Sequence, residues 1–243
     1  MARTFLTAHW RNLIMANYLV DPALLQPYFP PGTELDTWNG RCYASLVGFL
    51  FDRTRVLGLP IPFHQRFEEV NLRFYVRYND AGEWKRGVVF ISEIVPKRAI
   101  TWVANGLYGE RYAAMPMRHI WEEGPKQQRY RYEWQRAGHW NHLEVKTQGA
   151  PQPLSEGSEE QFIAEHYWGY AQRGTKGTTE YQVVHPSWEL RPVVGYEINC
   201  DAAALYGEAF AAPLSVRPSS VFLAIGSAVA VKAGQRLILD KNT

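Results

Sequence analysis

Four polar or amphipathic side chains share one face of residues 67–78, which alternate in the manner of a β-strand. These side chains are Glu69, Asn71, Arg73 and Tyr75. On an extended strand Glu69 and Arg73 lie roughly 13 Å apart, so they cannot pair with each other but can meet separate groups of one ligand. The pattern fits a strand that lines a barrel interior. The alternative is an antiparallel face turned to solvent.

A second set of polar groups lies in the apolar segment that follows Gly109. Tyr112 and Arg118 are its candidates for a ligand pocket, because an arginine in an apolar cavity receives a carboxylate through charge-assisted hydrogen bonds. Residues 112–121 are predicted to form one strand, so Met117 and Arg118 point to opposite faces and only one of them reaches a pocket. With Arg118 inside, the sequence favours a carboxylate ligand; with Met117 inside, it favours an apolar one.

Two later segments add Glu165, His166 and His185 to the candidate pocket. Residues 158–170 predict a helix, on which adjacent side chains point about 100° apart, so Glu165 and His166 can approach the same pocket. The alternative is a helix that packs its aromatic side chains on a sheet and keeps the histidine hydrogen-bonded at the edge.

Composition limits the classes of partner and location. The chain has 243 residues, of which 26 are Lys or Arg and 24 are Asp or Glu, a net charge of +2. This balance favours neither nucleic acid nor a membrane surface as a partner. The start of the chain has no signal-peptide pattern, and residues 221–231 are too short to span a bilayer. Two distant cysteines form no disulfide framework, so we expect a cytoplasmic protein and leave homo-oligomerisation open.

No motif for a metal or a cofactor is present. The sequence lacks a His-Glu-x-x-His, a Cys-x-x-Cys, an Asp-rich calcium loop, a Walker loop and a Gly-x-Ser-x-Gly elbow. His139 and His142 do not share one face of a strand. We therefore predict no cofactor and no metal site, although ligands from distant parts of the chain leave no spacing signal.

The predicted elements indicate an α+β fold of one domain, residues 1–243, dominated by antiparallel strands in a closed or nearly closed β-barrel with a few flanking helices. A turn at Asn39-Gly40 predicts that the segments on either side pair as a hairpin. Residues 53–65 predict a long loop of functional importance. The predicted strands are residues 10–20, 34–38, 41–52, 67–78, 84–95, 112–121, 128–135, 141–147, 181–185, 190–197, 219–224, 228–232 and 235–239, and the predicted helices are residues 22–29, 96–108, 158–170 and 202–207.

The chain also resembles the uncharacterised DUF2071 (YqjF-like) family, related in fold to acetoacetate decarboxylases. The decarboxylases have a Gly-Arg-Glu segment ending in Pro-Lys-Lys, which is similar to residues 109–118 here. In that comparison the two lysines fall on Met117 and Arg118, so the lysine that forms the Schiff base is missing. Residues 67–71 resemble a decarboxylase Tyr-Asn-Glu-Val segment, which implies that Glu69 faces the site. Residues 162–168 and 184–188 resemble DUF2071 signatures. Lys97 follows a proline too, but a helix start is a poor setting for a reactive amine.

The sequence thus supports a protein that binds a small organic molecule, such as a carboxylate, in an apolar barrel pocket. Two alternatives stay open: a lyase that acts on a keto acid with a different catalytic group, and a non-enzymatic interaction module. Whether the protein is an enzyme is left undecided. We expect Glu69 and Arg118 to form an ion pair in the pocket, and Glu69→Gln to strengthen carboxylate binding while lowering stability.

Overall fold

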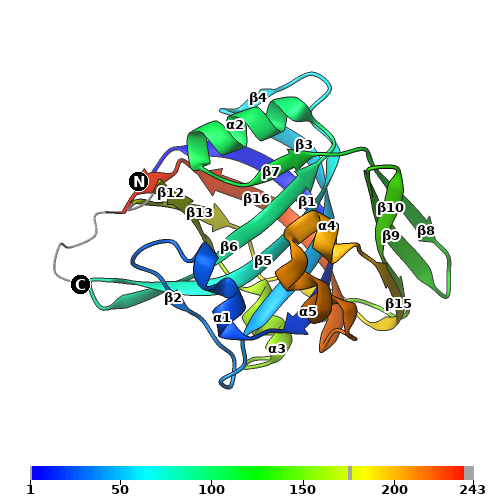
Figure 1. The fold of residues 1–243 in the computed structure, drawn as a ribbon. Helices are drawn as coiled ribbons and strands as arrows, with labels where there is room; N and C mark the ends of the chain where they lie inside the picture. The colour runs from blue at the N-terminus through cyan, green and yellow to red at the C-terminus, as the bar shows by residue number, and fades with distance from the viewer. Residues whose placement is uncertain (1, 175–176, 238–243) are drawn as a thin grey trace.

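Seven strands close into a barrel in the computed structural model, which describes residues 2–174 and 177–237 (Figure 1). The order around the barrel is β16-β1-β3-β5-β6-β12-β13, and pairing of β13 with β16 closes it. Among the seven barrel strands described, only the pairing of β6 with β12 is parallel, so the barrel is mixed. The predicted fold class is confirmed. The barrel strands are β1 (Thr4–Leu19), β3 (Tyr43–Val56), β5 (Phe67–Asp80), β6 (Glu83–Val95), β12 (Trp168–Arg173), β13 (Gly177–Val184) and β16 (Ser220–Lys232).

A second sheet of four strands packs on the outside of the barrel, at the right in Figure 1. Its order is β15-β10-β9-β8. The Tyr132 ring from this sheet lies over Gly48 of the barrel, where an added Cβ would stand 3.1 Å from the ring. A pair between His119 Nδ1 and Glu68 Oε1, 2.6 Å apart, also joins the two sheets. The strands are β8 (Met117–Glu123), β9 (Gln128–Arg136), β10 (His139–Thr147) and β15 (Val193–Asn199).

Short strands and helices complete the barrel. Ser158 caps α3 by accepting a hydrogen bond from the Gln161 amide at 3.1 Å, as the capping motif predicts. No helix in the described part of the chain is long and apolar enough to cross a membrane. The short strands are β2 (Glu34–Leu35), β4 (Leu59–Pro60), β7 (Tyr112–Ala114), β11 (Gln152–Pro153), β14 (Glu189–Arg191) and β17 (Gln235–Arg236). The helices are α1 (Pro22–Leu25), η1 (Gln26–Tyr28), α2 (Arg98–Tyr108), α3 (Glu159–Ala164), α4 (Ala202–Tyr206), η2 (Glu208–Phe210) and α5 (Ala211–Ser215).

Both faces of β5 are buried, which decides where its polar side chains point. Val70, Leu72, Phe74 and Val76 pack in the core beneath the second sheet and the outer helices. Glu69, Asn71, Arg73 and Tyr75, on the other face, are buried inside the barrel. The solvent-facing alternative for this face is therefore wrong: the apolar side chains face the outer layer and the polar ones face inward.

The chain leaves the barrel at Met115 and Pro116, where one predicted strand becomes two. Proline has no N–H to donate to a ladder, so β7 ends at Ala114 and β8 begins at Met117 in the other sheet. Pro192 divides residues 190–197 into β14 and β15 in the same way. The predicted strand over residues 112–121 is wrong for this reason.

Three other local predictions differ from the structure. The helix predicted for residues 158–170 ends at Ala164, because the aromatic run that follows forms β12 and pairs with β13. The Asn39-Gly40 turn forms, but it closes only one bridge between Trp38 and Arg41, and β2 pairs with β5 instead. Residues 53–65 contain the end of β3 and all of β4, which form a small hairpin.

Candidate functional site

The barrel encloses a cavity of about 410 Å³ whose wall is largely apolar. Rings from Trp10, Phe49, Phe51, Phe67 and Trp188 form much of this wall. Polar side chains from β5, β6, β7 and β13 line it as well, and they gather mainly around Glu69. A small organic molecule fits a cavity of this size and composition.

A row of three polar residues crosses neighbouring strands. Strand register places Asn71 of β5 opposite Glu93 of β6, and Glu93 opposite Tyr112 of β7. Residues opposite each other in a sheet point to the same face, so all three face the cavity. Glu69, two positions before Asn71, accepts from Asn71 Nδ2 at 2.9 Å and from the Tyr112 hydroxyl at 3.1 Å.

A third carboxyl group, that of Glu110, joins Glu69 and Glu93. The Tyr181 hydroxyl donates to Glu110 Oε1 at 2.8 Å. Tyr181 lies across from Gly169 in the β12–β13 register, and an added Cβ at Gly169 would stand 2.1 Å from the tyrosine ring. Glycine at this position therefore allows the ring to lie flat across β12 and reach Glu110.

Burial favours the protonated form of these three carboxyl groups. It raises the pKa of Glu69 to about 7, against the hydrogen bonds from Asn71 and Tyr112 and the charge of Arg73, which lower it. Burial also raises the pKa of Glu110 to about 7. The pKa of Glu93 rises well above its usual value through burial and then through the charges of Glu110 and Glu69. At neutral pH the cluster is thus partly protonated.

Arg73 is the cation of the cavity. Its side chain is 7% exposed, and its Nε has no hydrogen-bond partner among the residues that the structure describes. Its Nη2 donates to the Ile163 carbonyl at 3.4 Å and lies 3.9 Å from Met15 Sδ. These contacts are longer than the roughly 2.7–2.9 Å of a charge-assisted hydrogen bond to a carboxylate. Among the described residues Arg73 forms no ion pair within 4.0 Å.

His166 lies on the cavity wall against the Tyr75 ring, with centroids 4.6 Å apart. Arg86 Nε donates to Asp36 Oδ2 at 2.6 Å, and His166 Nε2 lies 3.5 Å from the same oxygen. Burial, with the nearby charge of Arg86, lowers the pKa of His166 to about 4 even though Asp36 opposes this. The imidazole is therefore neutral at pH 7, and its buried Nδ1 makes no hydrogen bond within the described residues.

His185 also lines the cavity. Its ring stacks on Trp188 with centroids 4.2 Å apart, and its Nδ1 lies 2.8 Å from the Pro186 carbonyl. Burial lowers the pKa of His185, which favours the neutral imidazole, and the stacking on Trp188 makes the ring part of the aromatic wall.

Six of the nine predicted pocket residues line the cavity: Glu69, Asn71, Arg73, Tyr112, His166 and His185. Met117, Arg118 and Glu165 do not. Met117 packs against the core between barrel and second sheet. Glu165 caps the end of α3 and accepts hydrogen bonds from Gln161 and Ser187.

The predicted ion pair between Glu69 and Arg118 is wrong. Arg118 lies on β8, where it pairs with Glu133 and stacks over the Trp140 ring at 4.3 Å. The break at Pro116 carries Arg118 into the outer sheet, away from the barrel interior. Arg118 therefore cannot serve as a ligand anchor in the cavity.

Glu93 and Tyr181 are cavity residues that sequence reasoning missed. Counting from the turn after Asp80 would have set Ser92 opposite Asn71, because a register shift between Leu72 and Arg73 is what brings Glu93 to that position. Tyr181 meets Glu110 across 71 positions of sequence, a contact that no local pattern indicates.

Comparisons with known proteins agree with the fold. The sequence model of the DUF2071 family, described as an uncharacterized conserved protein, matches residues 7–228. Uncharacterized protein YqjF of Bacillus subtilis (strain 168) is 37% identical over 84 residues, which are 34% of this chain and 33% of that protein. The matched part thus spans about a third of that relative's length.

Solved structures of low sequence identity share the architecture. The acetoacetate decarboxylase of Legionella pneumophila is 13% identical, with a TM-score of 0.63 over 96% of this chain and 87% of that one. An acetoacetate decarboxylase-like enzyme of Sphingomonas wittichii RW1 is 14% identical, with a TM-score of 0.66 over 97% and 94%. The enduracididine biosynthesis enzyme MppR, complexed with pyruvate, is 12% identical, with a TM-score of 0.64 over 98% and 91%. At these identities the likeness shows the fold alone.

Proposed function

Since the chain belongs to the DUF2071 family, whose members are uncharacterised, we propose a function from the cavity itself: it binds a small organic acid. In this proposal Arg73 receives the carboxylate, and the aromatic wall holds the apolar remainder of the molecule. The comparisons themselves extend to the family and to the acetoacetate decarboxylase-like fold.

The observation that carries the proposal is the poorly satisfied guanidinium of Arg73. An arginine keeps its charge under all ordinary conditions and has five N–H donors. Within residues 2–174 and 177–237 the Nε makes no hydrogen bond and the Nη2 makes only long ones. A buried cation without close compensation costs several kcal/mol. A carboxylate in the cavity would compensate this charge and accept two hydrogen bonds in a fork geometry.

The wall of the cavity supports an organic acid with a hydrophobic body. Aromatic and aliphatic side chains supply most of its surface, and burial of apolar surface contributes roughly 25 cal/mol per Å² to binding before ordering costs. The polar groups gather where the glutamates lie, so the ligand would have one polar end and one apolar end.

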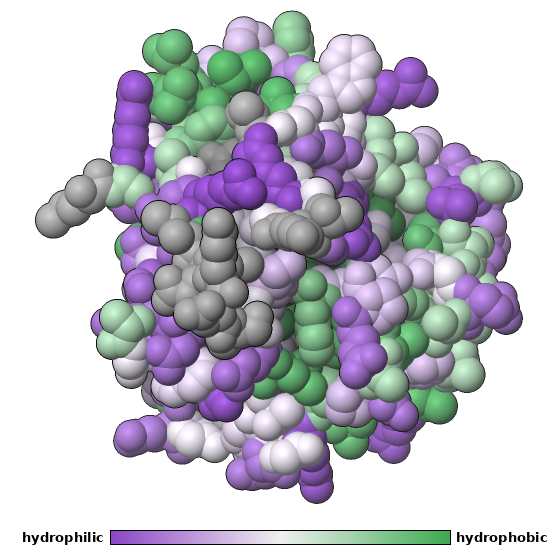
Figure 2. Space-filling model, turned by 60° about the vertical axis from the view of Figure 1, so that its left-hand side comes forward, coloured by the Kyte–Doolittle hydropathy of each residue, from purple (hydrophilic) through white to green (hydrophobic). Residues whose placement is uncertain are grey.

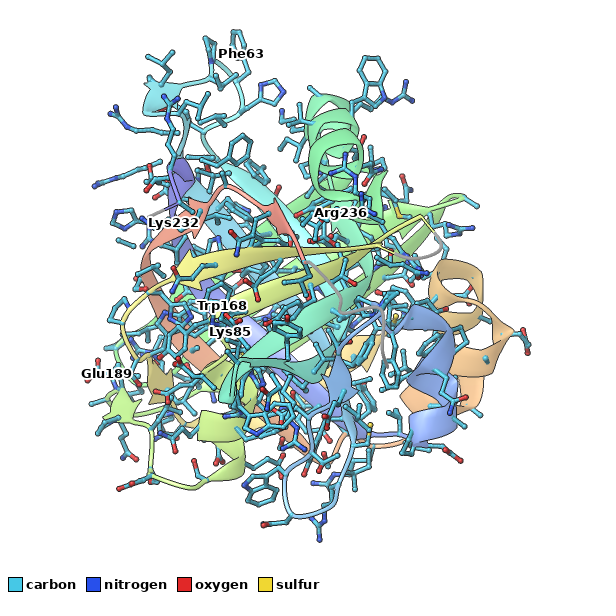
Figure 3. The ribbon with its side chains drawn as sticks, turned by 90° about the vertical axis from the view of Figure 1, so that its left-hand side faces the viewer. Phe63, Lys85, Trp168, Glu189, Lys232 and Arg236 are labelled. Carbon is cyan, nitrogen blue, oxygen red and sulfur yellow. The ribbon has the colours of Figure 1, made fainter. Side chains whose placement is uncertain are left out.

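Imine chemistry is not part of this proposal. No lysine lines the cavity in the described part of the chain. Lys85 lies 4.3 Å over the ring of Trp168, a wall residue (Figure 3), but its Nζ is held by Asp80 and Glu180. Burial lowers the pKa of Lys85, yet these two carboxylates outweigh it and raise the pKa. A nucleophilic lysine needs the opposite shift.

A proton-transfer enzyme is the second candidate, and one observation favours it. Glu69 and Glu110 have pKa values of about 7, where a carboxyl group acts equally well as general acid and general base. MppR, a protein of the same fold, is solved with pyruvate bound. A keto acid anchored on Arg73 would meet Glu69 on the same strand face, which suits abstraction of a proton next to its carbonyl.

Thermal shift with a panel of acids tests the binding proposal. Acetate, pyruvate, butyrate and hexanoate should raise the melting temperature of the wild type. Arg73→Met should abolish the shift, because Met removes the charge and keeps an apolar side chain. Arg118→Met is the matched control, since that arginine lies in the outer sheet, and it should keep the shift.

Two results would contradict the proposal. One is the absence of a shift with every acid in the wild type. The other is an equal shift in Arg73→Met and the wild type, which would move the anion site elsewhere. Retained binding with turnover of pyruvate would favour the enzyme candidate, and Glu69→Gln would then lose turnover while it keeps binding.

A further inference from the structure

Two segments at the top of the molecule (Figure 1) both supply residues to the cavity wall. One is the hairpin that contains β4, and the other is α2. Ile61 of the hairpin and Ala99 and Val103 of α2 line the cavity yet are exposed to solvent, whereas Glu93 at the inner end is buried. We call residues 53–66 and 96–106 the mouth face.

Large apolar side chains project from the mouth face. Phe63 is 89% exposed, Trp102 80% and Leu59 66%. Figure 3 shows Phe63 projecting outward at the top of the molecule. Figure 2 shows hydrophobic residues gathered at the top, with strongly hydrophilic residues on both sides. Apolar groups exposed together around a cavity opening are uncommon on a surface that meets only water, and they mark an interaction site.

The charge of the mouth face has a single sign. Its two segments contain five of the 26 cationic residues and none of the 24 acidic ones, so the rest of the chain has 21 against 24, a net charge of −3. The near-neutral net charge of the whole chain led us to expect no membrane partner. That sum does not reveal the excess of cations in these two segments. The five cations are Arg53, Arg55, Arg66, Lys97 and Arg98.

We propose that the mouth face docks on a lipid bilayer that contains anionic lipids, so that the cavity opens against the lipid. Exposed Phe, Trp and Leu side chains on segments whose charged residues are all Arg or Lys are the combination that binds the interface of an anionic membrane. The apolar groups enter the boundary between headgroups and acyl chains, and the cations pair with the phosphates. An amphiphilic ligand can then pass between bilayer and cavity without crossing water.

Charge complementarity selects a bilayer over a second copy of the chain. In a twofold dimer the same patch meets itself, so five cations would face five cations with no acid from these segments between them. An anionic bilayer attracts the same five side chains. The proposal does not depend on Arg73 or on the identity of the ligand, because docking involves only the outer rim.

Flotation with vesicles tests the docking. Vesicles of phosphatidylcholine mixed with an equal part of phosphatidylglycerol should carry the wild type, while vesicles of phosphatidylcholine alone should not. Higher salt should weaken the binding, because ions screen the attraction. The double variant Phe63→Ser with Trp102→Ser should reduce the partition coefficient at least about tenfold, since two large apolar anchors are removed.

Matched controls separate docking from general surface effects. Trp84→Ser removes another exposed tryptophan, 42% exposed, at the end of β6 away from α2, and should float like the wild type. Arg55→Glu with Arg66→Glu should abolish binding to the anionic vesicles, whereas Arg136→Glu, on the outer sheet, should not. Circular dichroism and melting temperature show that each variant is folded.

Three results would overturn the proposal. The first is a wild type that stays with neither kind of vesicle. The second is equal flotation of the double variant and Trp84→Ser. The third is a wild type that binds no vesicles but self-associates in sedimentation velocity, with the self-association lost in the double variant. The mouth face would then be a contact between copies of the chain. Loss of carboxylate binding in Arg73→Met leaves the flotation unchanged, so the two proposals fail separately.

Discussion

Replacing Glu69 with Gln should stabilise the protein at neutral and alkaline pH. The folded protein raises the pKa of Glu69 from its usual 4.5 to about 7, so folding favours the protonated acid. The sign follows from proton linkage: a group with a raised pKa in the folded state stabilises the fold below its unfolded pKa, and this contribution is lost as pH rises through the folded pKa. Gln resembles the protonated acid and does not ionise.

The size of the effect follows from the pKa difference. A shift from 4.5 to about 7 corresponds to about 3 kcal/mol at about pH 8, and to close to zero below about pH 4.5. For a chain of this length, 1 kcal/mol changes the melting temperature by roughly 2–4 °C. Glu69→Gln should therefore melt roughly 6–12 °C above the wild type at about pH 8 and near it in acid.

The hydrogen bonds around residue 69 can survive the substitution. The Tyr112 hydroxyl, which donates to Glu69, can donate to the Gln amide oxygen. Asn71 Oδ1 has no hydrogen-bond partner in the described part of the chain, so a rotated Asn71 amide can accept from the new NH₂ group. The comparison therefore isolates the ionisation of Glu69 from the loss of its contacts.

Thermal unfolding of both proteins, followed by circular dichroism from about pH 4.5 to 8, measures the difference. Glu68→Gln is the matched control on the opposite face of β5. Burial tends to raise the pKa of Glu68, but its bond with His119 lowers it. Removing this ionised partner should lower stability at neutral pH, a change of opposite sign.

A difference between Glu69→Gln and the wild type that stays constant over this pH range would refute the reasoning. So would a variant that becomes less stable than the wild type as pH rises, which is the direction expected from an ion pair with Arg118. The pairing of Arg118 with Glu133 removes the basis for that earlier expectation.

Three further predictions concern the lysines, Gly169 and His166. Treatment with acetoacetate and then borohydride should leave the protein mass unchanged, and a stable adduct on any lysine would contradict the absence of an imine site. Gly169→Ala should cost about 1–3 kcal/mol in unfolding free energy, because the Cβ displaces Tyr181 from Glu110, whereas Gly195→Ala, with open space around it, should cost far less. The lowered pKa of His166, about 4 against 6.5, means that the wild type loses stability as pH falls through this range. In His166→Gln the stability should fall less as the pH is lowered. If the variant loses as much stability in acid as the wild type does, His166 is not a buried neutral imidazole.

The inner face of β5 could be predicted because it depends on one short regularity. A strand alternates with a period of two wherever it is flat, and residues 67–80 form an unbroken strand, so Glu69, Asn71 and Arg73 necessarily share a face. The direction of this face depends on the outer layer. Leu72 and its neighbours pack beneath the second sheet, so the polar face turns into the barrel. The sequence alone left this choice open.

The placement of Arg118 could not be predicted by counting along the chain. Alternation holds only within one strand, and Pro116 ends the strand on which the count began. The same limit hid Tyr181, whose contact with Glu110 depends on how β12, β13 and β7 meet around the barrel. Such contacts are set by closure of the barrel, which no segment encodes by itself.

The aromatic run after α3 shows a third limit. Residues 167–170 suit either a helix face or a buried strand, because bulky aromatics have a strong strand preference when they find partners. Pairing with β13 decides for a strand. His166 consequently lies at the junction of α3 and β12, where it still reaches the cavity, although the helical reasoning that selected it was wrong.

Calorimetric titration of hexanoate into the protein near neutral pH, in phosphate and in Tris buffer, tests most directly whether a carboxylate binds beside the glutamate cluster. An added negative charge raises the pKa of Glu69 and Glu110, both about 7, so binding should take up part of a proton from the buffer. The reaction should then be less exothermic in Tris, whose ionisation absorbs more heat, and Arg73→Met should lose the signal. Equal enthalpies in the two buffers, or an unchanged titration of Arg73→Met, would contradict a carboxylate site in this cavity.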